Sequence, residues 1–459
     1  MSFLITLGLF TLVYVVLAVV IWFRTRNLAF PVGLALIYYW TYYGAWFVVV
    51  DRLRGYSLLR YEYLYAKLFP IYLDDSYFLT IVTYGLFLLA IEVALVLFLR
   101  KSAEEHSSGP IPRISHVALI LIAIATGLLS YYVIRGSLGA AAEMNVSSYE
   151  FVRIDDAAAG AYKIHQILMR AALFSVTAGL AIMASGRQAK VISSSRSMWI
   201  AFCYIALLGG LFYLNLKMGQ RRALASAAIS AGLLYLVNVK RASRILIFGS
   251  VAAVIVAMGY VGMTRGASLA GQNTLEAIKD SVIENLLSNE PFAAHLSLYG
   301  SIAYKLEPTY GSSLLYLASS MVPGAPRPID IYDYYTNGVH AIEGQGYNVH
   351  HAAAWYLNFG IAGVIAGGLL LGALWAGLYA LFQMRSRMGS HVLRIFAIFA
   401  VWMFTADLPT LCRTGPEGYK GTLLEALLIP TAVMLVATLR PIMMRGRPVL
   451  VPAVVALHA

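Results

Sequence analysis

The sequence predicts an all-α polytopic membrane protein with about eleven transmembrane helices and a large helical extracytoplasmic loop. Of its 459 residues, 60% are hydrophobic and only 12% are charged, whereas soluble domains carry roughly 25% charged residues. Many apolar runs reach the roughly 20 residues that a helix needs to cross a bilayer core. Backbone polar groups in lipid must bond within their own segment, so we expect these runs to form helices.

The apolar runs place eight transmembrane helices in residues 1–263 and three more, followed by a cytoplasmic tail, in 352–459. The first run, 2–23, has no basic stretch before it and no small-residue cleavage site after it. We therefore expect a retained helix and not a removable signal. The other expected helices cover 28–50, 78–99, 115–134, 164–185, 198–216, 223–239, 245–263, 352–382, 392–408 and 422–439.

The basic residues between these helices predict the orientation of the chain. The connections fall into two alternating sets, and each set holds sixteen Lys and Arg. The set that begins after the first helix is much the shorter, and its higher basic density indicates the cytoplasmic side. The amino terminus should then lie outside and the carboxyl terminus inside. Anionic headgroups account for the formal charge of +12, so no nucleic-acid partner is expected.

The largest connection, residues 264–351, is predicted to be a folded extracytoplasmic loop with short amphipathic helices. Asn273 and Glu276 have the spacing of a capping box and open a helical apolar pattern, which fits a helix lying on the membrane surface. The apolar stretches 292–306 and 312–322 indicate further short or re-entrant elements. Long ordered loops of this kind usually carry function.

No nucleotide-binding loop, zinc-protease motif or hydrolase nucleophile elbow is found, and two cysteines are too few for a metal cluster. We expect no cofactor and no metal. Four arginines are instead predicted near the outer surface: Arg221, Arg222, Arg265 and Arg327. Each of these arginines, taken alone, would fit the role of an interfacial residue whose side chain extends to the headgroups. Together they favour a lipid diphosphate, because the guanidinium fork donates paired hydrogen bonds to phosphate oxygens.

Two adjacent histidines, His350 and His351, precede the ninth predicted helix. We expect them to face water at the mouth of the bundle, where an imidazole can take a proton from a sugar hydroxyl. A structural hydrogen-bonding pair is the alternative. Tyr347 is a candidate for stacking on a sugar ring. The five glycines at 360–372 predict a face of close helix packing.

The order of these pieces resembles the Wzy-type polymerases of O-antigen and related bacterial polysaccharides, a group related to the O-antigen ligases. Gly219-Gln-Arg221 opens a predicted helix, and Arg265 closes the next. A long loop follows, and Tyr356-Leu-Asn-Phe-Gly-Ile-Ala-Gly363 begins the following helix. The resemblance covers roughly residues 217–372.

The resemblance implies a metal-independent glycosyltransferase of polysaccharide and lipopolysaccharide biosynthesis in the bacterial inner membrane. Its substrates would be oligosaccharide repeat units on undecaprenyl diphosphate, and its partners membrane lipids and a chain-length regulator protein. Basic residues would neutralise the departing diphosphate while a base accepts the hydroxyl proton. The residues with these roles would be Arg221 and Arg265 for the diphosphate, Arg222 and Arg327 in support, and His351 ahead of His350 as the base.

Two alternatives remain open. An O-antigen ligase would use the same donor with another acceptor, and the ligases look similar in placing a histidine shortly before a Gly-x-x-Gly helix start. A lipid-linked oligosaccharide flippase or transporter would use the intramembrane charges Glu92, Arg170 and Asp407. A transporter should also show repeat symmetry and broken helices. The concentration of polar residues in one outer loop favours the enzyme.

Overall fold

The computed structural model describes the helices named below and the residues that flank them. The described residues are 2–25, 72–99, 115–143, 156–188, 194–218, 290–319, 329–339, 349–384, 414–423 and 428–438, with shorter stretches within 42–53, at 227 and within 388–411.

Every regular element in these ranges is a helix, so the all-α prediction is confirmed for the described part of the chain. Among the described residues, six helices are long and apolar enough to cross a membrane, namely α1, α3, α4, α6, α7 and α14. The helices are α1 (Ser2–Thr25), α3 (Asp75–Phe98), α4 (His116–Glu143), α6 (Asp156–Gln188), α7 (Ser194–Lys217), α11 (Glu290–Ala303), α12 (Ser312–Ser319), α13 (Ile331–Gly338), α14 (His351–Met384), α16 (Pro416–Gly421) and α17 (Ile429–Thr438).

The predicted total of eleven spans remains a prediction. The expected helices at 28–50, 223–239, 245–263, 392–408 and 422–439 lie wholly or partly outside the described residues. The expected surface helix after Asn273 also lies outside them.

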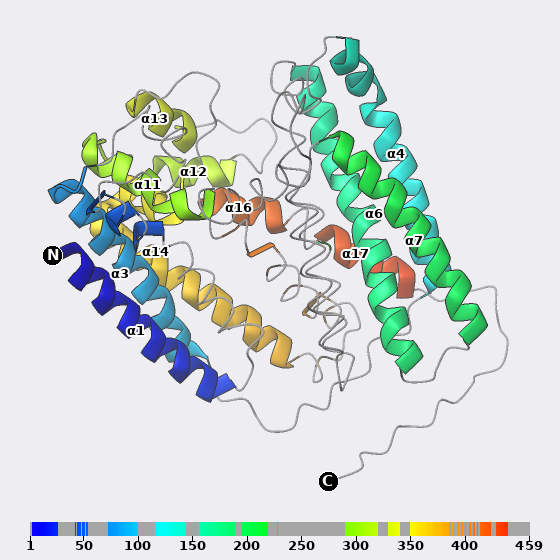
Figure 1. The fold of residues 1–459 in the computed structure, drawn as a ribbon, viewed down its shortest axis with the longest axis horizontal. Coiled ribbons are helices and arrows are strands. Elements are labelled where there is room, and N and C mark those ends of the chain that lie inside the picture. The colour runs from blue at the N-terminus through cyan, green and yellow to red at the C-terminus, as the bar shows by residue number, and fades with distance from the viewer. Residues whose placement is uncertain are drawn as a thin grey trace, which may run out of the picture.

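The helices form two groups, which Figure 1 shows on either side of the molecule. In one group α3 packs against α1, α11 and α14, and in the other α6 packs against α4, α7 and α17. The most apolar stretches of α3 and α6 are 61% and 67% buried, whereas those of α1, α4 and α7 are 17%, 22% and 22% buried. Thus α3 and α6 are the central helices of their groups, and the others leave apolar faces outward, as lipid-facing helices do.

Glycines allow α14 to approach α3 closely. A Cβ atom added at Gly368 would lie 2.5 Å from the Phe87 carbonyl oxygen, and one at Gly372 would lie 2.4 Å from that of Ile91. Both distances are shorter than any real Cβ contact, so the two backbones touch at these positions. The predicted role of these two glycines in close helix packing is confirmed.

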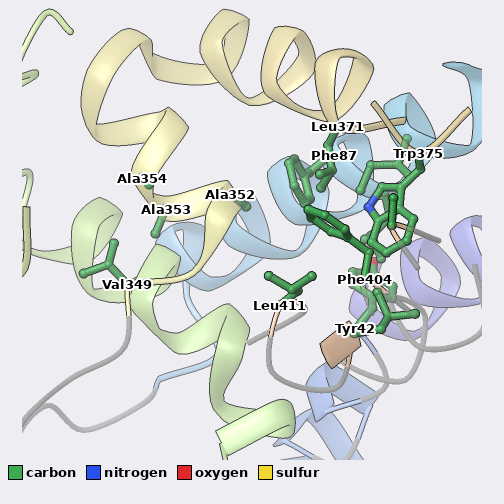
Figure 2. Packing of buried hydrophobic residues seen from close by; sticks show 14 of the residues in the cluster. Tyr42, Phe87, Val349, Ala352, Ala353, Ala354, Leu371, Trp375, Phe404 and Leu411 are labelled. Carbon is green, nitrogen blue, oxygen red and sulfur yellow. The ribbon is translucent and has the colours of Figure 1, made fainter. Parts of the chain in front are cut away.

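The predicted continuous helix at 352–382 is wrong in one respect, because α14 is broken after Asn358. Phe359 has φ −143° and ψ 19°, and Gly360 has φ 63° and ψ −152°. The second pair of angles falls in a region that essentially only glycine adopts. A short first piece, 351–358, is therefore joined through a sharp turn to a long second piece, 361–384 (Figure 2).

The short piece of α14 folds back along the long piece. A Cβ atom at Gly363 would lie 2.5 Å from the Trp355 carbonyl oxygen, and one at Gly367 would lie 2.3 Å from the Trp355 indole. In a straight helix residues 355 and 367 would be about 18 Å apart along the axis. Gly363 and Gly367 therefore leave room for the short piece of α14 to pack against the long piece, and not only for another helix.

Hydrogen bonds from the loop before α12 stabilise the break. The Leu357 carbonyl, which loses its helical partner there, accepts from the Thr309 amide at 2.7 Å and lies 3.3 Å from the Thr309 hydroxyl. The buried Asn358 side chain donates to Ser313 Oγ and to the Ala354 carbonyl, both at 2.7 Å. These bonds explain why an asparagine precedes the Phe-Gly pair.

Candidate functional site

Helix α11 contacts the histidine pair through Ser297. Its described side chains from His295 to Ile302 are all buried, and they include the polar residues His295, Ser297 and Ser301. His295 Nε2 lies 3.0 Å from the Tyr77 hydroxyl of α3. The Tyr299 hydroxyl accepts from the Tyr72 amide at 3.3 Å. Burial raises the pKa of Tyr299.

His350 caps the short piece of α14 and is bonded at both ring nitrogens. Its Nδ1 accepts from the Ala352 amide at 3.2 Å, and its carbonyl accepts from the Ala354 amide at 2.9 Å. Because an amide only donates, the proton of the neutral ring must be on Nε2, which lies 3.3 Å from the Tyr84 hydroxyl. The His350 amide donates to Ser297 Oγ of α11 at 3.1 Å. These bonds give His350 an architectural role at the helix start.

His351 is held differently. Its side chain is only 3% exposed, and its ring lies between Phe87, nearly parallel at 6.3 Å, and Tyr419, edge-on at 5.1 Å. Neither ring nitrogen has a hydrogen-bond partner among the residues that the structure describes. A buried polar group without a partner costs about 1–3 kcal/mol. Such groups in native structures require an explanation, and a catalytic role is one of the common explanations.

An aromatic cluster fixes Tyr419 beside His351. The Trp375 indole N–H donates to the Tyr419 hydroxyl at 3.0 Å, and the Phe404 ring lies 5.9 Å from both of these rings. Figure 2 shows Trp375, Phe404 and Phe87 as members of one buried hydrophobic cluster. Tyr419 belongs to α16, whose first turn touches the chain just before the histidines. Here a Cβ atom on Gly415 would lie 2.7 Å from the Val349 carbonyl oxygen.

The histidine pair lies deep within the helix bundle, so the expectation that it faces water is wrong. His350 is 0% exposed, and both rings pack against the Phe87 ring of α3. Phe87 lies roughly 18 Å along α3 from its first residue, at about 1.5 Å per residue. The pair lies beside the middle of α3 because the short piece of α14 folds back along the long piece.

All of the other predicted site residues lie outside the described part of the chain. These are Arg221, Arg222, Arg265, Arg327 and Tyr347. Their distance from the histidines therefore remains a prediction.

The structure adds residues that sequence reasoning did not single out for the site. Tyr84 and Tyr419 contact the histidine rings, and Ser297 binds the His350 amide. Tyr84 lies inside a long apolar run, and Tyr419 lies far away in the sequence, so no local signal could identify them. In the described residues, no group of three His, Cys, Asp or Glu could hold a metal ion.

Comparison of the chain with known protein families, curated proteins and solved structures finds no match. The fold and the site define the class by themselves: an α-helical membrane protein with a buried histidine pair at the start of a broken helix.

Proposed function

We propose that the chain is a membrane glycosyltransferase that joins oligosaccharide repeat units carried on undecaprenyl diphosphate, at the outer face of a bacterial inner membrane. The main support is the buried His351 imidazole, which has no hydrogen-bond partner at either nitrogen among the described residues. A neutral imidazole held in this way is available to accept a proton. The neighbouring His350 already makes its bonds within the protein.

In the proposed reaction a sugar hydroxyl of the acceptor unit attacks the anomeric carbon of the donor chain. A new C–O bond forms, the bond from that carbon to the diphosphate oxygen breaks, and the hydroxyl proton passes to His351. Undecaprenyl diphosphate leaves with the electron pair. Arg221 and Arg265, supported by Arg222 and Arg327, would stabilise the charge on the leaving group. Tyr347 would stack on a sugar ring.

The burial of His351 sets a condition on this reaction. The attacking hydroxyl must come within about 3 Å of a ring nitrogen, so the acceptor has to reach the His351 ring beside Phe87 of α3 and Tyr419 of α16. His350 would act there as a positioning residue, because its cap holds the first turn of α14. In this proposal His350 would position the helix turn, and His351 would act as the base.

The product distribution tests the proposal directly. The purified full-length chain in lipid vesicles is incubated with a defined undecaprenyl-diphosphate-linked repeat unit, and the products are separated by size. We expect a ladder of polymers that grows with time. A parallel incubation also contains lipid A core oligosaccharide, and a single transfer to that acceptor, with no ladder in either incubation, would instead identify an O-antigen ligase.

A flippase or transporter is the second candidate, because transporters often contain broken helices and buried charges. Glu92 of α3 is 4% exposed, and its Oε2 has no partner among the described residues. However, the long piece of α14, residues 361–384, still exceeds the roughly 20 residues of a full span. The break therefore lies at the end of the span and does not interrupt it, which favours the enzyme.

A leaflet assay separates the two candidates. Vesicles containing a fluorescent lipid-linked oligosaccharide are treated with impermeant dithionite, which quenches only the outer leaflet. We expect the protein not to change the protected fraction over time. Protein-dependent loss of protection that Glu92→Gln abolishes, without any ladder, would establish the transporter.

The proposed orientation predicts which residues are reached from outside the cell. Asn337 of α13 and Met384 at the end of α14 are both exposed and belong to opposite ends of this group of helices. In a cysteine-free background, Asn337→Cys should react with an impermeant maleimide in intact cells, and Met384→Cys only after lysis. The reverse pattern would put the histidine pair nearer the cytoplasm and would end the proposal of an outer active site.

The predicted diphosphate contact makes Arg221→Lys an informative change. Lysine keeps the charge but lacks the planar fork that binds two phosphate oxygens. We expect Arg221→Lys to lose most of the ladder-forming activity, nearly as much as Arg221→Ala, at equal membrane insertion. A lysine variant with the normal rate would reduce Arg221 to a nonspecific positive charge.

A further inference from the structure

Helix α12 has the opposite polarity to a helix in water. Its Ser313 side chain is 4% exposed and points to Asn358, whereas its Leu315 side chain is 65% exposed. Its serine hydroxyls are bonded within the protein. Ser312 Oγ donates to the Thr309 carbonyl, and Ser319 Oγ donates to the Tyr316 carbonyl at 3.1 Å. Internal bonding of polar groups with apolar groups outward is what a lipid environment requires.

Helix α13 has the ordinary polarity of a helix at a water-exposed surface. It buries Ile331 and Tyr335, which are 5% and 1% exposed, and it exposes Asp333 and Asn337. Its Tyr335 hydroxyl packs so tightly over α11 that a Cβ atom at Gly300 would lie 2.3 Å from it. The two neighbouring short helices therefore face different surroundings.

The apolar surface of α12 continues onto the outer face of α14. Tyr310, just before α12, is 81% exposed, and Phe359 and Ile361 at the break are 48% and 39% exposed. A Cβ atom at Gly311 would lie 3.2 Å from the Phe359 ring, so the loop and the break are in contact. Below them, α14 leaves Leu370 60% exposed on its outer face.

We infer that α12, with Tyr310 before it, lies in the interfacial layer of the bilayer and binds lipid acyl chains, whereas α13 lies in water. The membrane boundary passes between these two helices. The occupant of this surface is bulk membrane lipid, because the surface is continuous with the face that α14 presents to lipid. Tyrosine is enriched at this depth because its ring is apolar and its hydroxyl is polar. The inference depends on the fold alone and not on the proposed reaction.

Spin labels at matched positions test the inference. Cys203→Ala and Cys412→Ala provide the background, and a nitroxide is attached to Leu315→Cys on α12, Asn337→Cys on α13 or Leu370→Cys on α14. The full-length protein is placed in vesicles of phosphatidylethanolamine and phosphatidylglycerol. Collisions of each nitroxide with oxygen, which concentrates in lipid, are compared with collisions with a water-soluble nickel chelate. All three side chains are exposed, so the labels should not disturb the packing.

We expect the label at 315 to resemble the label at 370, with oxygen collisions exceeding nickel collisions several-fold, and the label at 337 to show the reverse. Nickel access at 315 equal to that at 337 would place α12 in water and overturn the inference. Protection of the label at 315 from both reagents would also overturn it, because α12 would then be covered by protein, such as a second copy of the chain.

Discussion

Replacing His351 by phenylalanine is expected to lower the rate of polymer formation by about a hundredfold or more while the bundle stays folded. The described structure shows no hydrogen bond that this change would break. The new ring can occupy the space between Phe87 and Tyr419, whereas the proton acceptor is lost. The measurement is the initial rate of ladder formation, together with thermal unfolding of the purified protein in detergent.

His350→Ala is the matched control, because it changes the neighbouring residue with the opposite set of contacts. It removes the bond to the Ala352 amide and the contact with the Tyr84 hydroxyl. The loss of such a cap costs about 0.5–2 kcal/mol, so this variant should unfold at a lower temperature. A normal rate in the His351→Phe variant would exclude His351 as the base. Loss of activity only in His350→Ala, at unchanged stability, would move the chemical role by one residue.

Gly368→Ala is expected to destabilise the bundle by about 1–3 kcal/mol, the usual cost of overpacking. The added methyl group would lie 2.5 Å from the Phe87 carbonyl oxygen and 2.7 Å from Ala90 Cβ. Neither neighbour is the flexible end of a long side chain, so α3 and α14 must move apart. Because Phe87 also packs against both histidines, the same change should lower activity. The expected readout is a lower unfolding temperature in detergent.

Gly377→Ala tests whether the effect comes from packing. Gly377 lies on the same helix, but nothing is within 4 Å of a Cβ atom added there. Alanine is favoured over glycine in a helix by about 1 kcal/mol, so this variant should unfold at the same temperature or a higher one. If both variants lose stability equally, the cause is not the contact between α3 and α14.

The positions of several helices could be predicted because a backbone segment in lipid must form its hydrogen bonds within itself. The expected helix at 2–23 is observed at Ser2–Thr25, and that at 78–99 is observed at Asp75–Phe98. Length and hydropathy define such segments whatever their neighbours are, since an unpaired backbone group in hydrocarbon is too costly. Helix ends are less determined, as Asp74 shows by capping α3 through the Tyr77 amide at 2.9 Å.

The break in α14 could not be predicted from the apolar run that contains it. Glycines at Gly360 and Gly363 are compatible both with a straight helix packed closely against another helix and with a turn. The choice depends on Thr309, nearly fifty residues earlier, which bonds the Leu357 carbonyl that the break leaves free. Such a partner is visible only when the chain is folded.

The sequence by itself determined the membrane class, the helical fold and the histidine pair as a candidate site, because composition and the position of polar residues at the edge of an apolar run are local properties. Only the tertiary structure decided the depth of the pair and the different hydrogen bonding of its members. His350 is bonded because Tyr84 and Ser297 come from two other helices. His351 has no bonding partner among the described residues because its neighbours there are rings. Burial and hydrogen bonding depend on contacts between distant segments, which the order of residues along the chain does not reveal.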